Sequence, residues 1–225
     1  MIFVKYEIKH RPSFSLVEVE LEEGEALQAE SGAMVFMSPN IKIETKAKGG
    51  IFGALKRSLL AGESFFINTF KAEGGAGKIG LAPPYPGDIE AFEIDGTLYA
   101  QSGAFLASSA DITIDTKWGG AKAFFAREGL FLLKMSGRGV VFLSSYGAIQ
   151  KVELNNERFI LDTGHLVAFS EGLDFKVRKV GGLKSTLLSG EGLVAEFHGT
   201  GTLYIQTRSL DSFLSWIIPH LPSKD

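Results

Sequence analysis

Residues 60–66 read Leu-Ala-Gly-Glu-Ser-Phe-Phe, and the chain contains this stretch in three versions. The second is residues 125–131, Phe-Ala-Arg-Glu-Gly-Leu-Phe, and the third is residues 188–194, Leu-Ser-Gly-Glu-Gly-Leu-Val. Each version places a glycine or arginine, a glutamate and a small residue ahead of an apolar run. A motif that returns at long, similar intervals indicates a repeated structural unit.

A second motif, a hydroxyl residue followed by glycine, precedes each version of the first. It falls between two apolar runs, and the three glycines are Gly32, Gly103 and Gly164. This arrangement predicts a bulge or a tight bend in a strand.

Positions counted from each of these glycines agree in residue type. In the three copies, the ninth residues after the glycine are Ile41, Ile112 and Leu173, and the eleventh are Ile43, Ile114 and Phe175. The fourteenth residues are Lys46, Lys117 and Arg178. Equal spacing along strands keeps equivalent residues on the same face. We therefore expect an internal triplication in which matching faces are buried together.

The remaining patterns predict strands. Alternation from Phe14 to Glu20 predicts a strand, and residues 22–25 predict a turn. Each copy ends in an apolar strand, a glycine-rich turn and a closing strand, which is typical of a β-hairpin. The three glycine-rich turns are residues 74–77, 137–139 and 199–201.

These patterns predict an all-β fold of three short β-sandwich or β-helix repeats that share one core, because no unit of this size buries a core alone. We place the repeats at residues 1–88, 89–155 and 156–208 of a single compact domain. Apolar residues at helical spacing then predict a C-terminal helix over residues 209–219, with Ser209 as its N-cap.

Composition excludes several kinds of chemistry. The 225 residues include no cysteine, so disulfides, thiolate nucleophiles and cysteine-ligated zinc are ruled out. A net charge of −3 gives the whole surface no electrostatic attraction for nucleic acid. The N-terminus is not a signal peptide and no stretch is apolar enough to span a membrane, so we expect a cytoplasmic protein.

Several motifs resemble one known family. They include Gly49-Gly50, Gly62-Glu63-Ser64-Phe65-Phe66 and Gly87-Asp88-Ile89, together with the three hydroxyl–glycine steps. The chain resembles, over nearly its whole length, the conserved uncharacterised proteins related to the mitochondrial biogenesis (altered inheritance of mitochondria) protein. This resemblance implies a TRAP-like fold, like that of the tryptophan RNA-binding attenuation protein: three short double-stranded β-helix units per chain, and three chains in a ring. It implies no catalytic residue.

The repeated polar residues offer candidate sites. Glu63, Glu128 and Glu191 favour a structural role, because catalysis needs groups in different environments rather than copies of one group. The cations at the fourteenth position, Lys46, Lys117 and Arg178, would form an anion-binding belt in a ring. Acids two residues before two of them, Glu44 and Asp115, weaken a continuous positive stripe and favour solvated strand ends instead.

Other motifs give no site. Residues 75–80 match the G-x-G-x-x-G pattern, but a strand rather than a helix is predicted to follow, so we interpret them as a turn. The four histidines lack metal-ligand spacing. We expect no catalytic residue, no cofactor and no metal.

The leading hypothesis is a non-enzymatic, ring-forming homotrimer that acts as a scaffold or binding module. The alternatives are an RNA- or anion-binding ring, which rests on the repeated cations, and a small-ligand-binding protein or enzyme, which rests on the repeated glutamates alone.

Overall fold

The computed structural model describes residues 4–44, 66–115, 131–179 and 193–222. Within these ranges the chain is built mainly of β-strands with a short helix near the C-terminus, so the predicted all-β fold class is confirmed. The strands are β1 (Lys5–Lys9), β2 (Leu16–Leu21), β3 (Ala26–Glu30), β4 (Met34–Met37), β5 (Ile41–Glu44), β6 (Ile67–Ala72), β7 (Gly77–Leu81), β8 (Ile89–Gln101), β9 (Phe105–Ser109), β10 (Thr113–Asp115), β11 (Leu132–Ser144), β12 (Ile149–Asp162), β13 (Leu166–Ser170), β14 (Leu173–Lys179) and β15 (Leu193–Gln206).

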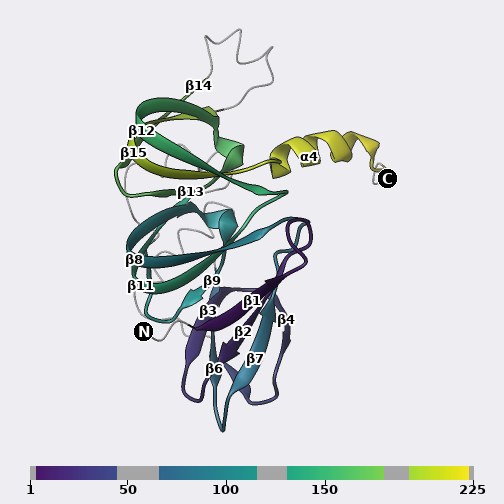
Figure 1. Ribbon diagram of the computed structural model, residues 1–225. Helices are drawn as coiled ribbons and strands as arrows, with labels where there is room; N and C mark the ends of the chain where they lie inside the picture. The colour runs from purple at the N-terminus through teal and green to yellow at the C-terminus, as the bar shows by residue number, and fades with distance from the viewer. Residues whose placement is uncertain (1–3, 45–65, 116–130, 180–192, 223–225) are drawn as a thin grey trace.

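Three successive segments of the chain stack one upon the next (Figure 1). We refer to residues 14–82, 88–144 and 148–206 as the first, second and third segments. The boundary predicted between residues 155 and 156 falls inside β12, whereas the one predicted between residues 88 and 89 falls at the start of β8.

Long antiparallel pairings build each segment. β8 pairs with β11 along its whole length, and β12 pairs with β15 in the same way apart from one irregularity. In the first segment the equivalent antiparallel pairing is divided between two sheets: β3 pairs with β6 in one sheet, and β2 pairs with β7 in the other.

Shorter pairings join neighbouring segments. β9 of the second segment pairs with β3 of the first, and β13 of the third pairs with β8 of the second, both antiparallel. These two junctions produce one 11-stranded sheet that runs through the molecule.

The hydrophobic core crosses the segment boundaries. The cluster centred on the first segment includes Leu106 and Phe142 of the second, and the cluster centred on the second includes Val167 and Ala168 of the third. Each buried side chain of this kind contributes about 1.5–3 kcal/mol. Each of these two segments therefore depends on the next for part of its core.

The hairpin prediction for the glycine-rich stretches is wrong. Gly137 and Gly139 lie inside the continuous strand β11, and Gly199 lies inside β15. Residues 74–77 lead from β6 into β7, which belong to different sheets. Positive φ is found, as predicted, at Gly74, Gly75, Gly137, Gly139 and Gly199. Inside β11 and β15 these glycines bend the strand without reversing the chain direction.

The predicted equivalence of positions holds for one set and fails for another. Ile41, Ile112 and Leu173 are all buried. Two residues further on, Phe175 packs against Phe169 and Phe197, but Ile43 is 43% exposed on β5. Ile43 belongs to β5, which pairs with β6 at the end of the 11-stranded sheet.

The predicted C-terminal helix is confirmed as α4 (Leu210–Ile217), followed by the 3-10 turn η4 (Ile218–His220). Ser209 caps it, since its hydroxyl accepts a hydrogen bond from the Ser212 N–H. Figure 1 shows α4 extending away from the third segment.

Candidate functional site

Most of the predicted polar candidates lie outside the described residues: Lys46, Lys117, Glu63, Glu128 and Glu191. Arg178 is described, on β14. Its Nε lies 3.2 Å from Glu196 Oε2, and Arg158 bonds the other oxygen of that carboxylate at 3.4 Å. Two guanidinium groups therefore share one carboxylate, which neutralises them only in part, and the anion-binding hypothesis stays a prediction for Arg178 as for the two lysines.

The three hydroxyl–glycine steps form the corners where the chain turns between strands, as the tight-bend prediction required. Gly32 has a φ of +92°. Gly103 and Gly164 lie in the 3-10 turns η1 (Ser102–Ala104) and η3 (Thr163–His165). A Cβ on Gly164 would come within 2.8 Å of Ser209 Oγ, so the corner needs glycine for close packing.

Polar side chains stand two residues before each corner glycine, at Glu30, Gln101 and Asp162. Burial raises the pKa of Glu30 to about 7. Gln101 Nε2 is buried with no hydrogen-bond partner, while Asp162 Oδ1 accepts the Gly164 N–H at 2.8 Å. The sequence analysis missed these positions, although their constant distance from the glycines was a usable signal.

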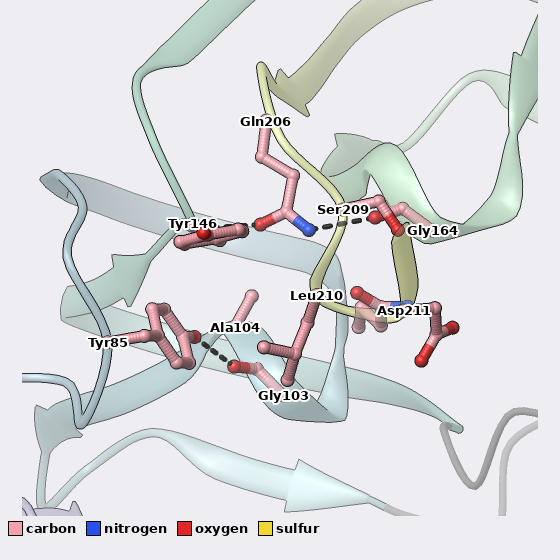
Figure 2. Close-up of a pocket in the computed structure, with 10 residues that line it drawn as sticks. Tyr85, Gly103, Ala104, Tyr146, Gly164, Gln206, Ser209, Leu210 and Asp211 are labelled. Atoms are coloured by element: carbon pink, nitrogen blue, oxygen red, sulfur yellow. Dashed lines mark hydrogen bonds between the residues drawn. The ribbon is translucent and has the colours of Figure 1, made fainter. Parts of the chain in front are cut away.

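A pocket of about 180 Å³ lies between the second and third segments at the start of α4, and Figure 2 shows most of its lining. Its lining residues are Tyr85, Gln101, Gly103, Ala104, Tyr146, Gly164, Gln206, Ser209, Leu210 and Asp211.

Several polar groups of this pocket bond one another (Figure 2). Gln206 accepts from the Tyr146 N–H at 2.9 Å and donates to the Gly164 carbonyl at 2.8 Å. The Tyr85 hydroxyl donates to the Gly103 carbonyl at 2.8 Å, and burial raises the pKa of this phenol above its usual value. These bonds hold the connecting residues Tyr146 and Tyr85 against the third and second segments, respectively. Polar groups that satisfy one another in this way favour a structural joint over a preformed ligand site.

A buried charge cluster fixes the N-terminal part to the second segment. Arg11 donates to both oxygens of Asp88, at 2.9 and 2.8 Å, and Ser15 donates to the same carboxylate at 2.8 Å. Burial alone would raise the pKa of Asp88, but these hydrogen bonds and that of the Ile89 N–H outweigh it and lower the pKa. Asp88 is therefore a structural anion.

The edge strand β4 exposes an unbroken run of apolar side chains. Met34, Val35, Phe36 and Met37 are 40, 55, 40 and 37% exposed. β4 lies at the end of its sheet, with β7 on one side. An apolar strand with an unpaired edge is a surface that invites pairing with another chain. The sequence analysis did not single out these four residues, although their continuous apolar run was visible.

A second apolar surface lies on α4, where Phe213, Leu214 and Trp216 are exposed. Phe213 packs against Tyr146 with ring centroids 5.7 Å apart, which attaches the helix to the connection between the second and third segments. His165 lines the adjoining cavity of about 350 Å³, but its Nδ1 bonds the Gln206 carbonyl rather than a reactive group.

The described residues lack two further features. Among them, no three acidic or histidine side chains gather as a metal site requires. None of their helices has the length and apolar character needed to cross a bilayer.

These features define a class: an all-β protein of three stacked antiparallel segments, in which no described strand covers the outer edge of the apolar strand β4. The chain belongs to the family described as mitochondrial biogenesis AIM24, whose model matches residues 6–208.

Two similar proteins come from Streptococcus pyogenes. An uncharacterised protein is 33% identical, over 98% of this chain and 92% of its own length. A crystal structure is 32% identical and superposes with a TM-score of 0.82, covering 97% of this chain and 100% of the other.

Proposed function

We propose that this protein is a non-enzymatic scaffold or binding module of the cytoplasm that assembles with copies of itself into a closed homotrimeric ring. The observation that carries the proposal is β4, where four consecutive apolar side chains are exposed on a strand edge that no other described strand pairs with. Such an edge is an aggregation hazard unless it is covered, and self-assembly covers it.

The proposal includes three copies of one TRAP-like β unit in each chain. Support comes from the strand pairing: β8 pairs antiparallel with β11 and β12 with β15, and in the first segment the two pairs β2–β7 and β3–β6 have the same antiparallel sense. The post-corner strands β4, β9 and β13 also pair alike, with β7, β11 and β15 respectively. A repeated unit whose neighbours share cores is suited to a ring, because every junction can use the same contacts.

Light scattering after size-exclusion chromatography tests the assembly. We expect a mass of three times the 24.3 kDa of one chain over a wide concentration range. A mass of one chain at micromolar concentration would overturn the proposal, and a mass of two chains would replace the ring by a dimer.

A further inference from the structure

We infer that β4 of one copy pairs antiparallel with β12 of the next copy, with Met37 opposite Ile160 of the partner copy. This inference deepens the proposed function and rests on it, since it names the two strands and the register that would join the chains. It is derived from the two junctions that already exist inside one chain.

The internal junctions share one register when positions are counted from the corner glycines. At the first, Ser108, five residues after Gly103, lies opposite Gln28, four residues before Gly32. At the second, Phe169, five residues after Gly164, lies opposite Tyr99, four residues before Gly103. Both junctions therefore follow one register rule: the residue five positions after a corner glycine lies opposite the residue four positions before the corner glycine of the preceding segment.

Among the strands that the structure describes, two lack the partner that this rule supplies. β9 and β13 each have a neighbour on both sides, but β4 pairs with β7 alone within the described ranges. β3 and β8 likewise have two neighbours, but β12 has one described partner, β15. Because β4 and β12 lie in the first and third segments, joining them between copies continues the series head to tail.

Applying the rule gives the register directly. Five residues after Gly32 stands Met37, and four residues before Gly164 stands Ile160. Ile160 is 55% exposed, whereas Tyr99 at the equivalent place of β8 stacks on Phe169 with ring centroids 5.0 Å apart. Met37 would cover Ile160 of the partner copy as Phe169 covers Tyr99.

Burial across the junctions agrees with this pairing. Leu106 and Val167 stand three residues after their corner glycines, are fully buried, and complete the core cluster of the preceding segment. Val35 stands three residues after Gly32 but is 55% exposed. In the proposed pairing, Val35 enters the core of the third segment of a partner copy.

Engineered cysteines test the register, since the chain has no cysteine of its own. Directly opposite residues of an antiparallel pair have Cα atoms about 4.5–5.5 Å apart, which is within the range of a disulfide. We expect Met37→Cys with Ile160→Cys to give covalent species of two and three chains on oxidation. Met37→Cys with Arg158→Cys is the control: its thiols are diagonal, at about 7–8 Å, so it crosslinks far less.

The outcomes separate the inference from the proposed function. Assembly without this crosslink, or a disulfide formed by Met37→Cys alone, would overturn the head-to-tail register while leaving self-assembly intact. A mass of one chain would remove both.

Introducing a charge into the proposed interface tests the inference independently, with the mass of the assembly as the measurement. We expect Val35→Glu to reduce the mass to that of one chain with its circular dichroism retained. Ile218→Glu, at a comparably exposed residue on η4, is expected to keep the mass of the parent protein. Retention of the parent mass by Val35→Glu would contradict the inference.

Discussion

At the scale of single residues, Arg11 and Asp88 show how a surface cation stabilises a buried anion. Arg11 is 41% exposed, but the carboxylate that it pairs with is 5% exposed. Removing the guanidinium leaves that carboxylate with fewer donors, and burial then opposes its ionised form.

We therefore expect Arg11→Ala to lower the free energy of unfolding by about 2 kcal/mol at neutral pH. The folded pKa of Asp88 is lowered, so its stabilising effect is present above the pKa of the unfolded chain and is lost as pH falls. The difference in free energy of unfolding between Arg11→Ala and the parent should thus become smaller at acid pH. Urea unfolding at neutral and acid pH measures this difference.

Lys71→Ala is the matched control for Arg11→Ala. It breaks an exposed ion pair with Glu73, and we expect a change below about 1 kcal/mol. An equal loss in both variants would show that the buried carboxylate is not the cause.

Glu30 gives a second prediction for a single residue, in which stability changes with pH in the opposite direction. Because burial raises its folded pKa to about 7, the folded chain retains a proton that the unfolded chain releases from its ordinary pKa of 4.5 upward. Stability contributed by this group falls as pH rises between these values, by up to about 3 kcal/mol.

Glu30→Gln removes that pH dependence, and the second segment already has glutamine at the corresponding position, Gln101. We expect a higher melting temperature than the parent above pH 7 and little difference near pH 4. Thermal unfolding across this pH range measures the effect, and a variant less stable at alkaline pH would contradict it.

At the scale of elements, the bends inside the long strands depend on glycine. Gly199 has a φ of +127°, and a Cβ there would lie 2.2 Å from the Gly172 carbonyl oxygen. Both the backbone conformation and the close approach of β15 to the turn before β14 exclude a side chain.

Gly199→Ala should destabilise the protein by about 2–4 kcal/mol. Gly24→Ala is the matched control, because Gly24 also has positive φ but a Cβ there would meet nothing within 4 Å. We expect about 1 kcal/mol for the control. Chemical denaturation compares the two, and equal losses would show that the close approach costs nothing.

At the scale of the whole molecule, assembly links stability to concentration. A chain that buries β4 only in a ring is stabilised by mass action when its concentration rises. We expect the melting temperature of the parent protein to increase over a hundredfold range of concentration, and that of Val35→Glu to stay constant. Calorimetry or fluorescence at several concentrations measures this, and a flat profile for the parent would oppose assembly under those conditions.

The amino-acid sequence by itself determined the local structure of this protein. Alternation over residues 16–20 predicted β2, the hydroxyl–glycine steps predicted the corners at Gly32, Gly103 and Gly164, and helical spacing predicted α4 with its Ser209 cap. These features follow from the periodicity and conformational range of neighbouring residues, which are readable from a short stretch.

Only the tertiary structure decided which strands meet. A glycine such as Gly137 permits both a hairpin and a bend, and the partner of β11 on each side selects the bend. Likewise, the apolar run of β4 resembles that of a core strand, and only the sheet order shows that β4 lies at the end of its sheet, beside β7. Strand pairing joins residues far apart in the chain, so the open edge is a property of the fold and not of any local pattern.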